Sequence, residues 1–214
     1  MNHANISVIL IIPSASYRTN PFIDAATKLD INILVITDKS QVFSEYYPDN
    51  VITMNFEHWQ ESIENIHEWS ERYDLKAVIG VDEESIILAA KLSESLCIEH
   101  NSLESVKLTK NKYLMRSELK KSGLKSPWFI RFYVHETPKD IFSELIFPCV
   151  IKPTFLSASQ GVLRVNSFEE FGKGCEMLSD LLAEEKVKKR GGDQANWILV
   201  EEYIPGKEVS IEGI

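Results

Sequence analysis

The stretch "IKPTFLSASQGVLRV", residues 151–165, joins two apolar runs across a loop of small residues. Lys152 stands near the end of the first run, and Gly161 opens the second. Short apolar runs bounded by turn residues are typical of buried strands, so we expect strands over 147–153 and 161–165. A lysine at a strand end beside free backbone N–H groups suits a phosphate. The alternative is a lysine that only decorates the surface before a turn.

The residues around this stretch predict a small α+β unit. One or two helices are expected within 103–127, which end at Gly123 as a C-terminal cap with Pro127 beyond it. Further strands are expected at 128–134, 196–204 and 206–214, a helix at 167–185, and a short helix after "ETPKD" (136–140). The alternating pattern of 206–214 stops without a cap or polar tail, so we expect a further unit to follow it.

The first hundred residues have a different pattern. Continuous β-rich runs alternate with helix-sized segments: strands are expected at 6–13, 31–38, 51–56 and 76–82, and helices at 20–30, 57–73 and 83–97. Buried strands without polar alternation, each separated by a helix, indicate a parallel sheet with helices on both faces. The predicted class is therefore α/β for the first half of the chain.

Polar residues follow the predicted strands of the first half. Ligands of open parallel sheets collect beyond the carboxyl ends of the strands, where the loop 13–20 and the pair Asp82 and Glu83 lie. Asp82 is equally well explained as a helix N-cap. For Ser14, Ser16 and Thr19 a plain polar turn is the favoured interpretation.

Composition excludes some classes of protein. The chain has 214 residues, 44% of them hydrophobic, and a formal net charge of −9, which disfavours nucleic acid as the main partner. The basic stretch 184–193 is interpreted as a solvated helix end before a Gly-Gly turn. Three widely spaced cysteines fit a reducing cytoplasm, and no run approaches the ~20 apolar residues of a membrane helix.

Charged residues in the second half form a pattern that suits a nucleotide. Lys112 begins a predicted helix, Lys152 precedes the small-residue loop, and Glu201, Glu202 and Glu208 surround a turn at 205–206. Lysines match phosphates, while carboxylates and free backbone groups match an adenine amino group and ribose hydroxyls. A solvated strand is the alternative for Glu201 and Glu202.

In these motifs the chain resembles the ATP-grasp superfamily. The matching segments are "NK" (111–112), "PCVIKP" (148–153), "SASQGV" (157–162) and "VEEYIPGKE" (200–208), in the family's order. The resemblance implies a Rossmann-like pre-ATP-grasp domain over 1–106 and a linking helix with the first lysine over 107–126. It further implies a lid lobe over 127–196, and an adenine hinge with the start of a C-terminal lobe over 197–214.

The resemblance also implies roles for particular residues. Lys112 and Lys152 would contact ATP phosphates, with Lys152 also near adenine N7, and Glu201 would accept from the adenine amino group. The lid loop would comprise Ser157, Ala158, Ser159, Gln160 and Gly161; the backbone of Glu202, Tyr203 and Ile204 would read the ring edge; and Glu208 would hold the ribose. Asn111 departs from the family's aspartate, which puts the positioning of Lys112 in question.

A family of this kind uses ATP to turn a carboxylate into an acyl phosphate that an amine or similar nucleophile attacks. Its magnesium ligands and its acyl-phosphate arginine would follow residue 214, so this chain is expected to be inactive alone. One alternative is a non-catalytic nucleotide-binding module or a subunit completed by a partner chain that carries the C-terminal lobe. Another is a biotin-carboxylase-like enzyme, against which the glycine-poor loop counts. The carboxylate and nucleophile substrates cannot be inferred from the sequence.

Overall fold

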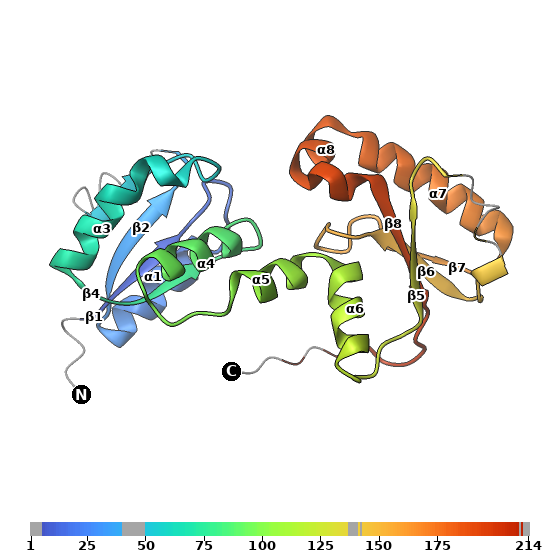
Figure 1. Cartoon of the computed structure of the whole chain (residues 1–214), viewed down its shortest axis with the longest axis horizontal. Coiled ribbons are helices and arrows are strands. Elements are labelled where there is room, and N and C mark those ends of the chain that lie inside the picture. The colour runs from blue at the N-terminus through green and yellow to red at the C-terminus, as the bar shows by residue number, and fades with distance from the viewer. Residues whose placement is uncertain (1–5, 40–49, 137–140, 142, 210, 212–214) are drawn as a thin grey trace. The chain divides into compact units, whose positions relative to one another are not determined.

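The structure is a computed structural model that describes residues 6–39, 50–136, 141, 143–209 and 211. The chain forms two compact units that divide between Lys107 and Leu108 (Figure 1). Within the described residues, no helix is both long and apolar enough to cross a membrane.

The first unit contains a parallel four-stranded sheet, as the sequence predicts. Its order is β3-β2-β1-β4, and all of its pairings are parallel. The strands are β1 (Ile6–Ile11), β2 (Asn32–Thr37), β3 (Val51–Thr53) and β4 (Asp74–Gly80). β1 lies at the centre, where Ile9 is opposite Leu34 on one side and Val78 on the other.

Helices cover both faces of this sheet. They are α1 (Thr19–Leu29), the 3-10 helix η2 (Trp59–Ser62), α3 (Ile63–Arg72) and α4 (Ile86–Ser95), and α5 (Leu103–Lys110) spans the division between the units. Alternate residues of a strand point to opposite faces. Ile9 and Leu34 accordingly pack with Ile66 of α3 and Leu92 of α4, whereas Val35 on the other face packs with Phe22 of α1.

The second unit contains an antiparallel four-stranded sheet. Its order is β5-β8-β6-β7, from strands β5 (Phe129–Tyr133), β6 (Cys149–Pro153), β7 (Leu163–Val165) and β8 (Trp197–Glu202). The helices are α6 (Lys112–Lys121), α7 (Phe168–Ala183), α8 (Glu185–Gly191) and the 3-10 helix η4 (Gly192–Asn196). The predicted α+β unit is therefore confirmed.

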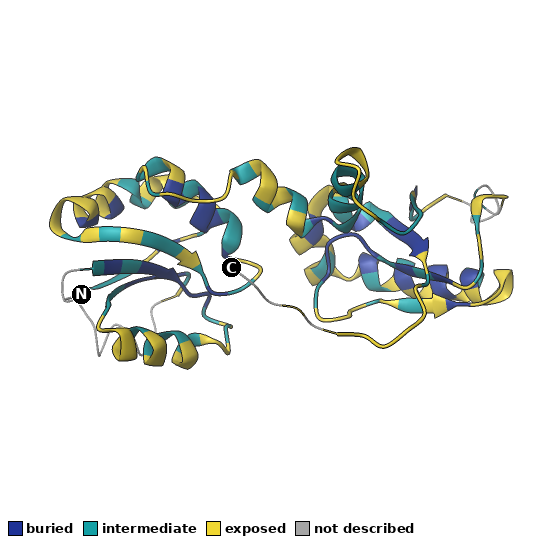
Figure 2. Cartoon of the chain, turned by 90° about the horizontal axis from the view of Figure 1, so that it is seen from below, coloured by how far each residue is buried: buried dark blue, intermediate teal, exposed yellow. Residues whose placement is uncertain are grey.

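The two longest helices of this unit cover opposite faces of its sheet (Figure 1). Phe171 and Leu178 of α7 pack on the apolar face formed by residues such as Ile151 and Val200. Gly174 allows this close approach, because a Cβ there would lie 2.5 Å from Ile151 Cδ1. On the other face, Tyr113 of α6 lies edge-on to Phe129 of β5. Figure 2 shows buried residues concentrated in the strands and on the inner sides of the helices.

Three sequence predictions for the second unit need comment. The strand expected at 206–214 is wrong for residues 206–209, which form no strand; residues 210 and 212–214 lie outside the described residues. Of the short helix expected after 136–140, residues 141, 143 and 144 are described and have 3-10 conformation, whereas residue 142 lies outside the described residues. The basic stretch 184–193 forms α8, whose Lys188, Lys189 and Arg190 are exposed, before the turn at Gly192, where φ is +50°.

Candidate nucleotide-binding site

A lysine and a glutamate from neighbouring strands form the centre of the candidate site. In the pairing of β6 with β8, Val150 lies opposite Glu201, so Lys152, two residues further along β6, lies diagonally from Glu201 on the same face. Lys152 Nζ donates to Glu201 Oε1. The side chains are only 13% and 8% exposed, so this ion pair is largely desolvated.

A third charged side chain joins this pair from α6. Arg116 Nε donates to Glu201 Oε2 at 3.2 Å, and the Arg116 side chain is 22% exposed. Each oxygen of the Glu201 carboxylate thus has its own cation. We call Lys152, Glu201 and Arg116 the Glu201 cluster.

At the start of α6, Lys112 lies against the residues that immediately precede the predicted lid loop. The Lys112 backbone N–H donates to Thr154 O at 2.8 Å, and Lys112 Nζ donates to Leu156 O. Leu156 immediately precedes Ser157. The structure therefore brings Lys112 together with the loop that the resemblance assigns to phosphate binding.

Asn111 is the N-cap of α6 and so positions Lys112, the first residue of the helix. Its Oδ1 accepts from the backbone N–H groups of Tyr113 and Leu114, at 3.0 and 3.1 Å, as a capping side chain does. Its Nδ2 donates to Gln194 Oε1 at 2.9 Å, and Asn111 is only 6% exposed. The amide thus supplies the cap that an aspartate would supply and adds a donor.

The predicted lid loop is a turn with an unusual backbone. Ala158, Ser159 and Gly161 have φ of +52°, +58° and +70°. The turn is closed by hydrogen bonds from Gln160 N to Ser157 O at 3.1 Å and from Val162 N to Ser159 O at 3.3 Å. The side chains of 158–160 are exposed, so the small residues leave the backbone accessible, as the sequence predicts.

Gly161 is required at the end of this loop for two reasons. Its φ of +70° lies in the left-handed region, which is costly for residues with a Cβ but not for glycine. A Cβ would also lie 2.8 Å from Leu181 Cδ2 and 2.9 Å from Leu178 Cδ2. Gly161 therefore lies close against α7.

The residues of the predicted adenine hinge lie at the end of β8 and just after it. The Glu202 N–H donates to Trp128 O at 3.0 Å, so it is not available to a ring edge. Tyr203 lies under the Arg164 guanidinium, 4.0 Å from ring centroid to Cζ. Ile204 is 67% exposed and Glu208 is also exposed, so neither side chain packs into the sheet.

Sequence reasoning missed Arg116, Arg164 and Gln194. A signal for Arg116 was present, because it follows Lys112 by four residues and so lies on the same side of α6. Arg164 and Gln194 become neighbours of the candidate residues only through strand pairing and loop packing, which the sequence does not display.

The polar residues at the carboxyl ends of the first sheet bond to one another. Ser14 N–H and hydroxyl donate to Asp38, at 2.6 and 3.1 Å. Asp82 Oδ1 accepts from Glu84 N–H at 3.1 Å and the Ser85 hydroxyl at 3.3 Å, which stabilises the turn before α4. The contacts of Ser14 favour its interpretation as part of a polar turn. The expectation that Asp82 is a helix N-cap is wrong, because Ser85 is the N-cap of α4 and Asp82 lies in the turn before it.

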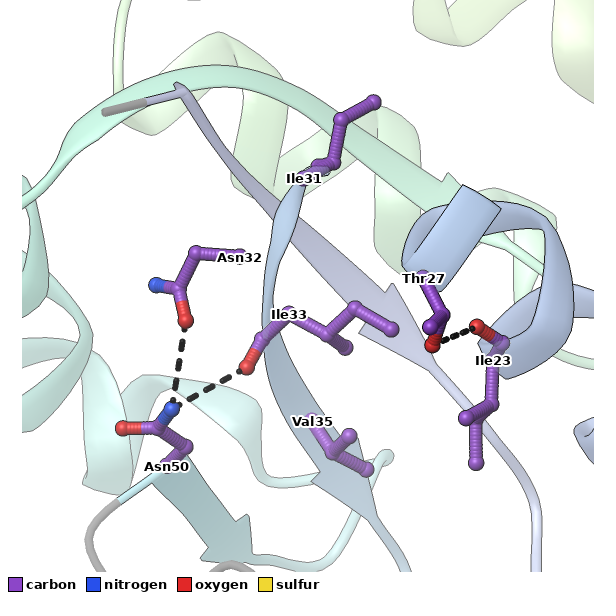
Figure 3. Close-up of a pocket in the computed structure, with 7 residues that line it drawn as sticks. All are labelled: Ile23, Thr27, Ile31, Asn32, Ile33, Val35 and Asn50. Atoms are coloured by element: carbon purple, nitrogen blue, oxygen red, sulfur yellow. Dashed lines mark hydrogen bonds between the residues drawn. The ribbon is translucent and has the colours of Figure 1, made fainter. Parts of the chain in front are cut away.

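A cavity of about 140 Å³ lies in the first unit, between α1 and the start of β2 (Figure 3). Asn50 Nδ2 in its wall donates to Ile33 O at 3.3 Å and to Asn32 Oδ1 at 3.5 Å. The remaining lining is mainly isoleucine and valine. Because it lies at the amino end of β2 and contains none of the predicted residues, we assign it no part in nucleotide binding.

No group of three or more His, Cys, Asp or Glu side chains suited to a metal occurs in the described parts of the chain.

Residues 145–214 of the chain match the family model described as the ATP-grasp domain. The sequence resemblance is thereby confirmed.

Known proteins similar to the chain are ligases and synthetases. It is 25% identical over 201 residues to the alanine–anticapsin ligase of Bacillus subtilis (strain 168), a match covering 86% of this chain and 42% of that protein. The L-amino acid ligase structure from Bacillus licheniformis superimposes with a TM-score of 0.67 at 20% identity, covering 94% of this chain and 47% of that one. The ADP complex of N5-carboxyaminoimidazole ribonucleotide synthetase has a TM-score of 0.65 at 15% identity, covering 94% and 48%. The chain thus spans less than half the length of these three proteins.

Proposed function

We propose that this chain supplies ATP-binding residues of an ATP-grasp ligase that joins a carboxylate to an amine or similar nucleophile. In that reaction the γ-phosphoryl group moves from ATP to a carboxylate oxygen and ADP leaves. The nucleophile then displaces phosphate from the acyl carbon. The alanine–anticapsin and L-amino acid ligases among the similar proteins support a carboxylate–amine reaction of this kind.

The observation that supports ATP binding most is the largely buried Lys152–Glu201 pair on β6 and β8. Lys152 would bind phosphate oxygens, and Glu201 would accept from the adenine amino group beside it. Lys112 and the turn Ser157–Gly161 would add a second cation and backbone N–H groups around the phosphates.

The hinge would bind the rest of the nucleotide. Because the Glu202 N–H is engaged by Trp128, the ring edge would be recognised by the Glu202 carbonyl and the backbone of Tyr203 and Ile204. Glu208 would accept from the ribose hydroxyls. No magnesium ligand is proposed among the described residues.

The experiment is a calorimetric titration of the 214-residue chain with ATP, comparing Lys152→Ala with Lys125→Ala. Both variants remove one lysine charge from the second unit, but Lys125 is exposed in the loop after α6. Loss of a charge-assisted phosphate contact is expected to weaken binding by about 1–3 kcal/mol in Lys152→Ala. Equal affinities of the two variants would remove Lys152 from the site.

A further inference from the structure

The Glu201 cluster contains one more cation than the buried carboxylate needs. Glu201 Oε1 accepts from Lys152 on β6, while Oε2 accepts from Arg116 on α6. The carboxylate is 8% exposed, so water contributes little to the stabilisation of its charge. A single well-placed cation would already neutralise it.

The proposed function, on which this inference rests, makes the second cation useful. When Lys152 turns its ammonium group toward phosphate, it weakens or gives up its contact with Glu201. A carboxylate left buried without a counter-ion is strongly unfavourable, and this cost would be subtracted from the binding of ATP. With only Lys152 as partner, Glu201 would hold the lysine back from the phosphates.

We propose that Arg116 is a positioning residue: it keeps the Glu201 carboxylate paired so that Lys152 can exchange Glu201 for the phosphates of ATP. Arg116 suits this role because its guanidinium stays protonated throughout the working pH range. It also approaches the other carboxylate oxygen from a different element, so a movement of Lys152 leaves its contact with Glu201 intact.

This role predicts that Arg116 affects only the part of the affinity that depends on the phosphates. Adenosine has no phosphates to draw Lys152 away, so the Lys152–Glu201 contact stays in place and Arg116 is not needed to keep the Glu201 carboxylate paired. A merely structural ion pair would behave differently, since its loss would disturb β8 and lower the affinities for adenosine and for ATP by the same factor.

The test is a set of calorimetric titrations with ATP and with adenosine on the full chain. Arg116→Gln is expected to lower the affinity for ATP about tenfold or more and the affinity for adenosine by less than about twofold. Arg116→Lys, which retains the charge, is expected to recover most of the ATP affinity. Lys121→Gln is the matched control, because it removes an exposed positive charge from the same helix and is expected to change neither affinity.

A double-mutant cycle provides the second readout. Glu201→Gln removes the charge that Arg116 neutralises, so adding Arg116→Gln to it is expected to change the ATP affinity by less than about twofold. Unchanged ATP affinity in Arg116→Gln, or equal loss for ATP and adenosine, would overturn the proposal. A wild-type chain that binds neither ligand would refute the proposed function itself, and this inference with it.

Discussion

At Gly161 the backbone has a φ of +70°, and a Cβ would lie within 3.0 Å of Leu178, Leu181 and Pro153. Gly161→Ala is therefore expected to lower the free energy of unfolding by about 2–4 kcal/mol, from the left-handed backbone and the overpacking together. Urea denaturation measures this loss.

Gly172 supplies the control for that substitution. It lies inside α7, where a Cβ would meet nothing within 4 Å. Gly172→Ala is expected to stabilise the chain by about 0.5–1 kcal/mol, because alanine favours a helix over glycine. Equal stability of the two variants would contradict the role assigned to Gly161.

The three cysteines are expected to differ in reactivity. Burial raises the pKa of Cys149 to about 11 and that of Cys175 to about 12, whereas Cys97 is exposed. Because only the thiolate reacts, a disulfide reagent at about pH 8 is expected to modify Cys97 quickly and the other two only on unfolding. Cys97→Ser should abolish the fast phase, and three equal rates would contradict the burial.

The same pKa shifts make stability depend on pH in a defined direction. A thiol whose pKa is raised in the folded state contributes stability at pH values below its unfolded pKa of 9.0. This contribution is lost as the pH rises through about 11 for Cys149 and about 12 for Cys175. Part of the alkaline loss of stability is therefore expected to disappear in Cys149→Ala.

Individual residues show how far the sequence could predict the site. Lys152 and Lys112 were identified from motifs; the structure places Lys152 beside the predicted Glu201, and Lys112 against Leu156, which immediately precedes the predicted loop. The contact between Lys152 and Glu201 could not be predicted, because it depends on the register that sets Val150 opposite Glu201. Arg116 was missed because a helix-face arginine has many possible partners until the helix is packed.

Among the elements, α6 contributes two charged residues of the candidate site, Lys112 and Arg116. Removal of its cap in Asn111→Ala is expected to cost about 1 kcal/mol of stability. Because the helix start also orients Lys112, the affinity for ATP is expected to fall as well. Thermal unfolding and calorimetry measure the two effects.

Ser167 provides a matched control for the cap of α6. It caps α7 by accepting from Glu170 N–H at 3.2 Å, and α7 contributes none of the charged candidate residues. Ser167→Ala is expected to cost a similar amount of stability and to leave ATP affinity unchanged. If both variants lowered the affinity for ATP equally, α6 would have no special role in ATP binding.

The sequence predicted helices and strands well where their patterns were long, but it misplaced the ends of strands and the strand expected from residue 206. The apolar runs of the first half became β1, β2, β3 and β4 with shifted ends, because apolar continuity marks a strand but not its last hydrogen bond. The strand expected from 206 failed for 206–209: alternation alone does not make a strand when those residues have no neighbouring strand to pair with.

At the scale of the whole molecule, the candidate site lies in the second of the two units. Lys112, Arg116, Lys152, Leu156 and Glu201 all lie between residues 108 and 214. The ATP-grasp match also falls in this unit, over 145–214. We therefore propose nucleotide binding for this unit and propose no ligand for the first.

The measurement that tests this account most directly is affinity labelling with an acyl-phosphate derivative of ATP, which acylates lysines beside the bound phosphates. Peptide mass spectrometry then identifies the modified lysines. The account predicts labelling of Lys112 or Lys152 that excess ATP suppresses, with exposed lysines such as Lys125 unaffected by ATP. Labelling confined to exposed lysines, or labelling of Lys112 and Lys152 that ATP does not reduce, would contradict the account.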